Sequence, residues 1–112
     1  MGNRVVVTGL GCMTPLGNDV ASSWEACING QSGIDRITHF DPELFRCQIA
    51  GEVKKFQLPE IIPIKEAKKM DLFIQYSIGA TQEALNDSGL EITEDIEEEV
   101  GVSMGVGIGG LG

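Results

Sequence analysis

The sequence has 112 residues, of which 42% are hydrophobic and 22% are charged, and its formal net charge at pH 7 is −9. This length allows one domain at most, and the acidic balance argues against nucleic acid as a general partner. The apolar stretches are too short to span a membrane, and no apolar signal core follows Arg4. We therefore expect a cytoplasmic protein that binds neither nucleic acid nor membrane.

The cysteine and histidine content offers little material for a metal site. The sequence has three cysteines, an odd number, and they lack the CxxC spacing of zinc ligands: Cys12, Cys27 and Cys47. His39 is the only histidine. We expect reduced, partly buried thiols and no bound metal.

The positive charges are concentrated in one part of the chain. Seven of the seventeen acidic residues fall between residues 87 and 99, whereas six of the eight cations fall between residues 46 and 69. These six are Arg46, Lys54, Lys55, Lys65, Lys68 and Lys69. An acidic protein that gathers its cations in one place is suited to bind an acidic partner there.

The first strand is predicted close to the N-terminus. Val5, Val6 and Val7 are typical of a strand buried on both faces of a parallel sheet, and the turn residues after them direct the chain into a helix, as in an α/β layered domain. Gly9 and Gly11 also suggest a dinucleotide-binding turn. That motif needs a third glycine three positions after the second, where this sequence has a threonine followed by a proline. We therefore favour a central strand with a tight exit.

A helix is predicted from its N-cap at Asn18 or Asp19 to a left-handed C-cap at Gly30. Trp24 is expected in the core, because it belongs to an apolar stripe at helical spacing that consists of Val20, Trp24, Cys27 and Ile28. A long irregular segment is expected after the helix. Alternating apolar and polar residues then predict a short, half-exposed strand over residues 47–53.

A short basic helical turn is predicted to begin at Ile64 and to reach Met70. Pro59 and Pro63 exclude a long helix before it. Lysines at helical spacings of three and four residues are expected to direct their ammonium groups to one side, and these are Lys65, Lys68 and Lys69.

A second helix is predicted from a cap at Asp71 to about Ser88, with Gly89 as its end. Gly79 and Ala80 offer a small face for close packing. We expect this helix to be deeply buried for much of its length, with an apolar stripe formed by Ile74, Ile78, Thr81 and Leu85.

The last part of the sequence predicts an acidic connector, over residues 91–99, and then a strand. Residues 100–106 alternate strictly between an apolar face and a face of glycine and serine, which lets another backbone come close. The glycine-rich end is not a P-loop, because the Lys-Ser/Thr pair is missing. A helix should follow such a turn, so we expect the beginning of a larger domain whose open sheet at Gly112 favours aggregation.

These motifs, in this order, resemble the N-terminal part of the β-ketoacyl-acyl carrier protein synthases, the condensing enzymes of the thiolase fold. The resemblance covers all 112 residues and is strongest for the type II elongation enzymes of bacterial fatty-acid synthesis. Its markers are Val5–Gly11, Thr14–Gly17, Gly30–Ile34, His39–Asp41, Lys68–Asp71, Phe73–Tyr76, Asp87–Leu90 and Gly107–Gly110.

The resemblance implies an α/β fold of five αβαβα layers, of which residues 1–112 would form an incomplete N-terminal part, without a second domain, in a homodimer. It implies an acyltransferase without a cofactor, which takes an acyl chain from acyl carrier protein onto a cysteine. Such an enzyme decarboxylates malonyl-carrier protein and joins the carbanion to the acyl group. The family's nucleophilic cysteine and two histidines match no residue here, so we expect no catalytic residue and no condensation by these 112 residues alone.

Two family features match residues of this sequence. Lys65, Lys68 and Lys69 match the basic patch that binds the acidic helix of acyl carrier protein. The family often has arginine at position 68, and lysine loses its bidentate pairing with a carboxylate. Gly107 and Ile108 match the far end of the acyl pocket near the dimer interface, where the side chain at 108 influences acyl-chain length.

Simpler alternatives remain for both features, namely a solvated basic turn and ordinary packing of Ile108. For the whole chain, the alternatives are a non-catalytic module that binds acyl carrier protein and a related ketosynthase, either of unsaturated-chain elongation or of the polyketide type.

Overall fold

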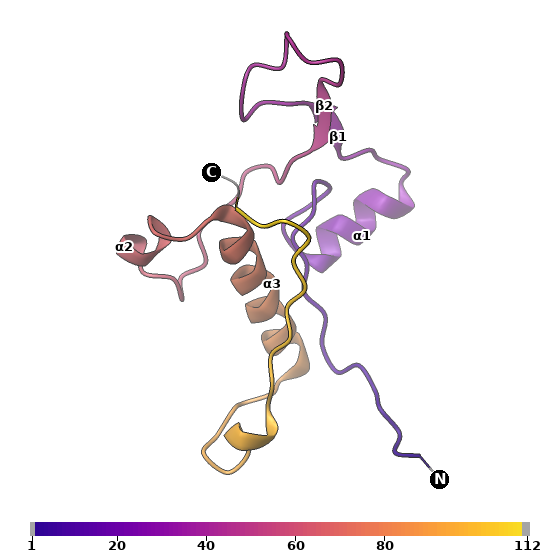
Figure 1. Ribbon diagram of the computed structural model, residues 1–112. Coiled ribbons are helices and arrows are strands. Elements are labelled where there is room, and N and C mark those ends of the chain that lie inside the picture. The colour runs from indigo at the N-terminus through magenta and orange to yellow at the C-terminus, as the bar shows by residue number, and fades with distance from the viewer. Residues whose placement is uncertain (1, 111–112) are drawn as a thin grey trace. The chain divides into compact units, whose positions relative to one another are not determined.

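The computed structural model describes residues 2–110 (Figure 1). The chain divides into two compact units, and each is described by itself. One unit consists of Met1–Gly11 together with Leu58–Gly112, and the other consists of Cys12–Gln57.

The helix of the second unit, α1, spans Val20–Ile28 and begins at the predicted N-cap. The Asp19 carboxylate accepts hydrogen bonds from the Ser22 backbone N–H, at 2.7 Å, and from the Ser22 hydroxyl, at 2.6 Å. These hydrogen bonds lower the pKa of Asp19, because they stabilise the ionised carboxylate.

The C-terminal end of α1 is closed by a Schellman motif. Gly30 has φ of +67°, which costs a residue without Cβ little. Its N–H donates to the carbonyl of Cys27, and the N–H of Gln31 donates to the carbonyl of Ala26. The predicted helix is therefore confirmed at both ends, from interactions between residues close in the sequence.

The prediction that Trp24 lies in a core is wrong. Its side chain is 64% exposed, and the buried residues of α1 are Ser23 and Ala26. The stripe that includes Val20, Trp24 and Cys27 does form one face, but this face borders an open cavity, which leaves the indole ring accessible to solvent.

The two strands of this unit form an antiparallel pair, in which β1 spans Ile34–Arg36 and β2 spans Ile49–Gly51. β2 confirms the short strand predicted within residues 47–53. β1 lies in the segment predicted to be irregular, and that prediction is wrong there. Three residues carry little local strand signal, and the strand exists because its backbone groups pair with β2.

The first unit contains α2, at Ile64–Ala67, and α3, at Leu72–Ser88. Both confirm the predicted helices, and α3 ends at Gly89, which has φ of +66°. Asp71 is the N-cap of α3, although its side chain makes no capping hydrogen bond. The acidic connector holds a short 3-10 helix, η1, at Glu97–Glu99. No helix within residues 2–110 is long and apolar enough to cross a membrane.

The extended segment at residues 9–11 packs tightly against α3. A Cβ on Gly9 would collide with the carbonyl oxygen of Ala84, and one on Gly11 would collide with that of Ala80. The Leu10 N–H donates to the Asp87 carboxylate at 2.9 Å. The close approach involves Ala80, one of the two residues of the small face predicted on α3.

The central strand predicted at Val5–Val7 is wrong. The three valine side chains are 90%, 57% and 79% exposed, and β1–β2 is the one ladder among the described residues. A strand buried on both faces needs hydrogen-bonded neighbours, and residues 5–7 have none within residues 2–110.

The prediction that α3 is deeply buried is also wrong. Gln75 and Gly79 are its buried residues, because the extended segments at residues 9–11 and 102–106 cover only part of its surface. The second of these segments, drawn in yellow in Figure 1, runs beside α3 without forming the predicted strand ladder.

Candidate functional site

The three lysines lie on one short structure, which we call the basic turn and define as Ile64–Met70. It consists of α2 and the turn that leads to α3. The backbone N–H of Lys69 donates to Glu66, at 2.9 Å, and that of Met70 donates to Ala67, at 3.1 Å. These bonds between residues three apart tighten the last turn. Lys65, Lys68 and Lys69 are all exposed.

The charges of the basic turn are unevenly engaged. Lys69 Nζ lies 3.4 Å from Glu66 Oε1, and both side chains are largely exposed to solvent. Lys65 and Lys68 form no ion pair with any residue within 2–110. Two ammonium groups are therefore available to an acidic partner, and the third is shared with a neighbouring carboxylate.

The other half of the cation cluster seen in the sequence belongs to the other unit. There, Lys54 Nζ lies 3.5 Å from the carboxylate of Asp35. The pKa of Asp35 is lowered, first by the hydrogen bond from the Arg36 backbone and then by the nearby charge of Lys54. Of the six clustered cations, the three on the basic turn therefore belong to one unit and the other three belong to the other unit.

The sequence-predicted pocket residues, Gly107 and Ile108, follow the segment that runs beside α3. Both are exposed, and the Ile108 side chain is 77% accessible. The next two residues contact the beginning of α3, since a Cβ on Gly109 would lie 3.3 Å from the Phe73 ring and one on Gly110 would collide with the Asp71 carboxylate. The glycine-rich turn therefore packs against the first turn of α3.

A cavity of about 400 Å³ separates α3 from the preceding part of that segment. It brings together two patterns predicted separately, because its walls include the α3 stripe and the apolar face of the alternating segment. The lining residues from these two patterns are Ile74, Ile78, Thr81, Leu85, Val102, Met104 and Val106. The alternation over residues 100–106 therefore predicted the correct face without the predicted strand.

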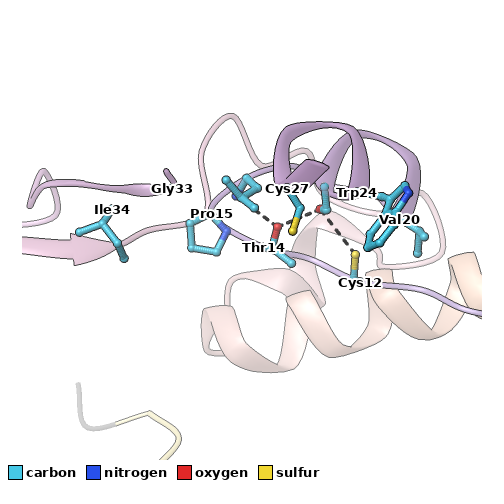
Figure 2. Close-up of a pocket in the computed structure, with 10 residues that line it drawn as sticks. Cys12, Thr14, Pro15, Val20, Trp24, Cys27, Gly33 and Ile34 are labelled. Atoms are coloured by element: carbon cyan, nitrogen blue, oxygen red, sulfur yellow. Dashed lines mark hydrogen bonds between the residues drawn. The ribbon is translucent and has the colours of Figure 1, made fainter. Parts of the chain in front are cut away.

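A second cavity, of about 460 Å³, lies in the unit of residues 12–57 and was not predicted from the sequence (Figure 2). Its apolar wall comes from the α1 stripe, Pro15 and Ile34. Its polar edge is a small network in which the Cys12 thiol donates to the Ser23 hydroxyl, at 3.6 Å, and that hydroxyl lies 2.8 Å from Thr14 Oγ1 (Figure 2).

Among the described residues, the lining of the second cavity places no basic side chain beside its thiols. A nucleophilic cysteine needs a base or a nearby positive charge, and the described residues that line the cavity include no histidine, lysine or arginine. No disulfide links the described residues, and Cys12 is half-buried whereas Cys27 and Cys47 are exposed. Within residues 2–110, no group of His, Cys, Asp and Glu side chains is placed to hold a metal ion.

One further residue, Gln75, lies beside the basic turn, and no sequence pattern predicted a role for it. Gln75 is only 9% exposed, and its side-chain amide donates to the backbone carbonyls of Ala67 and Met70. The sequence indicated its burial only weakly, through its place directly after Ile74, next to the apolar stripe of α3.

The sequence of the chain matches a family of known proteins. The family of the β-ketoacyl synthase N-terminal domain matches residues 2–112. The chain is 57% identical over 108 residues to 3-oxoacyl-(acyl-carrier-protein) synthase 2 of Vibrio harveyi, and 46% identical to the protein of that name in Staphylococcus aureus. Each alignment covers 96% of this chain and 26% of the relative, so the chain spans about a quarter of the length of these proteins.

Solved structures of similar proteins agree with the predicted fold class. The ishigamide ketosynthase/chain length factor has a TM-score of 0.66 and 33% identity over 80% of this chain and 22% of that chain. A β-ketoacyl synthase from Burkholderia phymatum has a TM-score of 0.65 and 28% identity over 85% of this chain and 24% of that chain. The chain therefore has the N-terminal part of a thiolase-like α/β fold.

Proposed function

The chain belongs to the β-ketoacyl synthase family, and we propose that it forms the N-terminal part of a 3-oxoacyl-(acyl-carrier-protein) synthase of type 2. The observation that carries this proposal is its 57% identity, over 96% of its length, to the protein of that name in Vibrio harveyi. In this proposal, residues 1–112 all belong to the N-terminal domain of a cytoplasmic homodimer. The catalytic cysteine and both histidines lie in the part of such a synthase that these residues do not cover.

The proposed reaction elongates an acyl chain in two steps. The cysteine sulfur attacks the thioester of the acyl-carrier protein, so that a new C–S bond forms and the thiol of the carrier protein leaves. Malonyl-carrier protein then loses CO₂. The resulting carbanion attacks the acyl carbonyl, which forms the C–C bond and releases the cysteine as a thiolate.

The role we assign to the basic turn is to bind acyl carrier protein. Its three exposed lysines attract an acidic surface, raise the rate of encounter and orient the carrier protein. Lys65 and Lys68 carry most of this role, because Lys69 is shared with Glu66.

The test replaces the three lysines together with alanine in the full-length gene product. We expect KM for malonyl-carrier protein to rise by about tenfold, with little change in kcat, because binding is weakened before any chemistry occurs. The matched control replaces Arg46, Lys54 and Lys55 with alanine, which changes the net charge equally in the other unit. Equal KM values for the two triple variants would refute docking at the basic turn.

We assign Gly107 and Ile108 to the far end of the acyl pocket. Ile108→Ala is then expected to raise kcat/KM for the longest acyl substrates relative to shorter ones by about tenfold, because a shorter side chain leaves more room. The control, Ile92→Ala, alters another exposed isoleucine on the acidic connector. An unchanged chain-length profile in Ile108→Ala would contradict the assignment.

A ketosynthase of a different subtype is the second candidate function. The observation that favours it is the likeness to the ishigamide ketosynthase/chain length factor, with a TM-score of 0.66. The 33% identity to that protein is lower than the 57% identity to the Vibrio harveyi synthase, so the elongation enzyme is the better supported of the two.

A further inference from the structure

The basic turn is too short to hold its own shape. Its helix, α2, has four residues, and an isolated helix of this length is unstable in water because nucleation costs more than its few hydrogen bonds return. The N-cap position is occupied by Pro63, which makes no side-chain capping bond. The carbonyl groups at the C-terminal end also need partners from outside the helix.

Gln75 adds side-chain hydrogen bonds to the backbone bond that the Met70 N–H already gives the Ala67 carbonyl. Its Nε2 donates to the carbonyl of Ala67, the last residue of α2, and to the carbonyl of Met70, where the basic turn ends, each at 3.0 Å. The two acceptors lie on either side of Lys68 and Lys69. The buried Gln75 amide therefore links the backbone before these two lysines to the backbone after them.

The Gln75 side chain is well fixed because of its position in α3. It lies in the first turn of a helix of 17 residues, and it is one of the two buried residues of that helix. The Asp71 side chain makes no capping bond at the same helix end, so it offers the turn no equivalent side-chain connection. The structure of the basic turn is thus tied to α3 through Gln75.

We infer that Gln75 is a positioning residue for the proposed carrier-protein site: it holds the basic turn to α3 so that its lysines meet the acidic partner in one arrangement. This inference rests on the proposed function. Gln75 does not touch the partner, and it acts through the backbone that carries Lys68 and Lys69.

The test is Gln75→Met in the full-length gene product, with binding of purified acyl carrier protein as the readout. Methionine keeps the length and the helix propensity but lacks both donors. We expect binding to weaken by about five- to tenfold, mainly through faster dissociation, because the charges that steer encounter remain. The matched control is Gln82→Met on the same helix, where the side-chain amide donates to Asn86 within α3, and it should leave binding unchanged.

A double-mutant cycle separates positioning from general damage. In the background with alanine at positions 65, 68 and 69, Gln75→Met is expected to have no further effect on binding. Equal weakening in both backgrounds would overturn the inference, because Gln75 would then act independently of the lysines. Unchanged binding in Gln75→Met, with weakened binding in the lysine variant, would overturn the inference and leave the docking proposal standing. Unchanged binding in the lysine variant would refute the docking proposal itself.

Amide hydrogen exchange keeps the test decisive if Gln75→Met reduces stability. The amides of Lys69 and Met70, which close the basic turn, should exchange faster in this variant, whereas those in the middle of α3 keep their protection. Uniform loss of protection through α3 would indicate general destabilisation and would contradict a positioning role.

Discussion

Glu66 is the residue that limits the positive charge of the basic turn. Its carboxylate lies 3.4 Å from Lys69 Nζ, and both groups are largely exposed. An exposed pair of this kind contributes little stability, yet the negative charge weakens the attraction of the turn for an acidic partner.

Glu66→Gln is therefore expected to strengthen carrier-protein binding by about two- to threefold at low ionic strength, with the gain lost at high salt. The measurement is a binding titration at two salt concentrations. Glu25→Gln makes the same change in net charge on α1, in the other unit, and should have a smaller effect. An equal gain in both variants would mean that only net charge matters.

Glu52 organises the loop that precedes β2. Its carboxylate accepts hydrogen bonds from the backbone N–H groups of Thr38 and His39 and from the Thr38 hydroxyl. Burial by itself raises the pKa of Glu52, but the hydrogen bonds from Thr38 and His39 outweigh it and lower the pKa below the ordinary value of 4.5.

A lowered carboxylate pKa contributes stability above the unfolded value, and this contribution is lost as pH falls through the folded value. We expect the contacts of Thr38 and His39 to be intact at neutral pH and to open below pH 4.5. An NMR titration of the two amides checks this, and Glu52→Gln should remove the transition. If Glu43→Gln removed it equally, the assignment to Glu52 would be wrong.

At the scale of elements, the contact between residues 9–11 and α3 depends on the absence of side chains. A Cβ on Gly11 would collide with the Ala80 carbonyl and would lie 2.8 Å from the Ala84 nitrogen. Gly11→Ala is expected to lower the free energy of unfolding by about 1–3 kcal/mol, because backbone must move to admit the methyl group.

The measurement is the urea midpoint of the full-length gene product. Gly101→Ala is the matched control, since a Cβ there meets no atom within 4 Å. Equal midpoints for the two variants would show that the segment and α3 do not depend on this close approach.

At the scale of the whole molecule, the described residues leave large apolar side chains open to solvent. Val5, Val7, Val102 and Ile108 are each more than three-quarters exposed. Valine and isoleucine are among the residues most often buried in folded proteins. Surface of this kind is normally covered by other parts of a fold or by another chain.

Prepared as 112 residues, with a mass of 12.0 kDa, the protein is expected to unfold in urea without a cooperative transition. Far-UV circular dichroism is the better probe, because Trp24 is already 64% exposed and its fluorescence should change little. A sharp transition at this mass would contradict the expectation and would favour the module that binds acyl carrier protein without catalysis.

The ends of α1 and α3, and the start of α2, follow from chemistry between residues close in the sequence. Asp19 reaches an N–H three residues away, Gly30 and Gly89 accept left-handed backbone, and Pro63 precedes α2. Such interactions need no distant partner, so the pattern of residue types was enough to predict them.

Burial, pairing and anchoring were decided by the tertiary structure. The valines near the N-terminus have the composition of a central strand, but a strand is buried only when neighbours pair with it. β1 exists through its pairing with β2, and Gln75 reaches carbonyls five and eight residues before it, across a turn. These features depend on which segments meet in space, and local residue patterns carry little information about that.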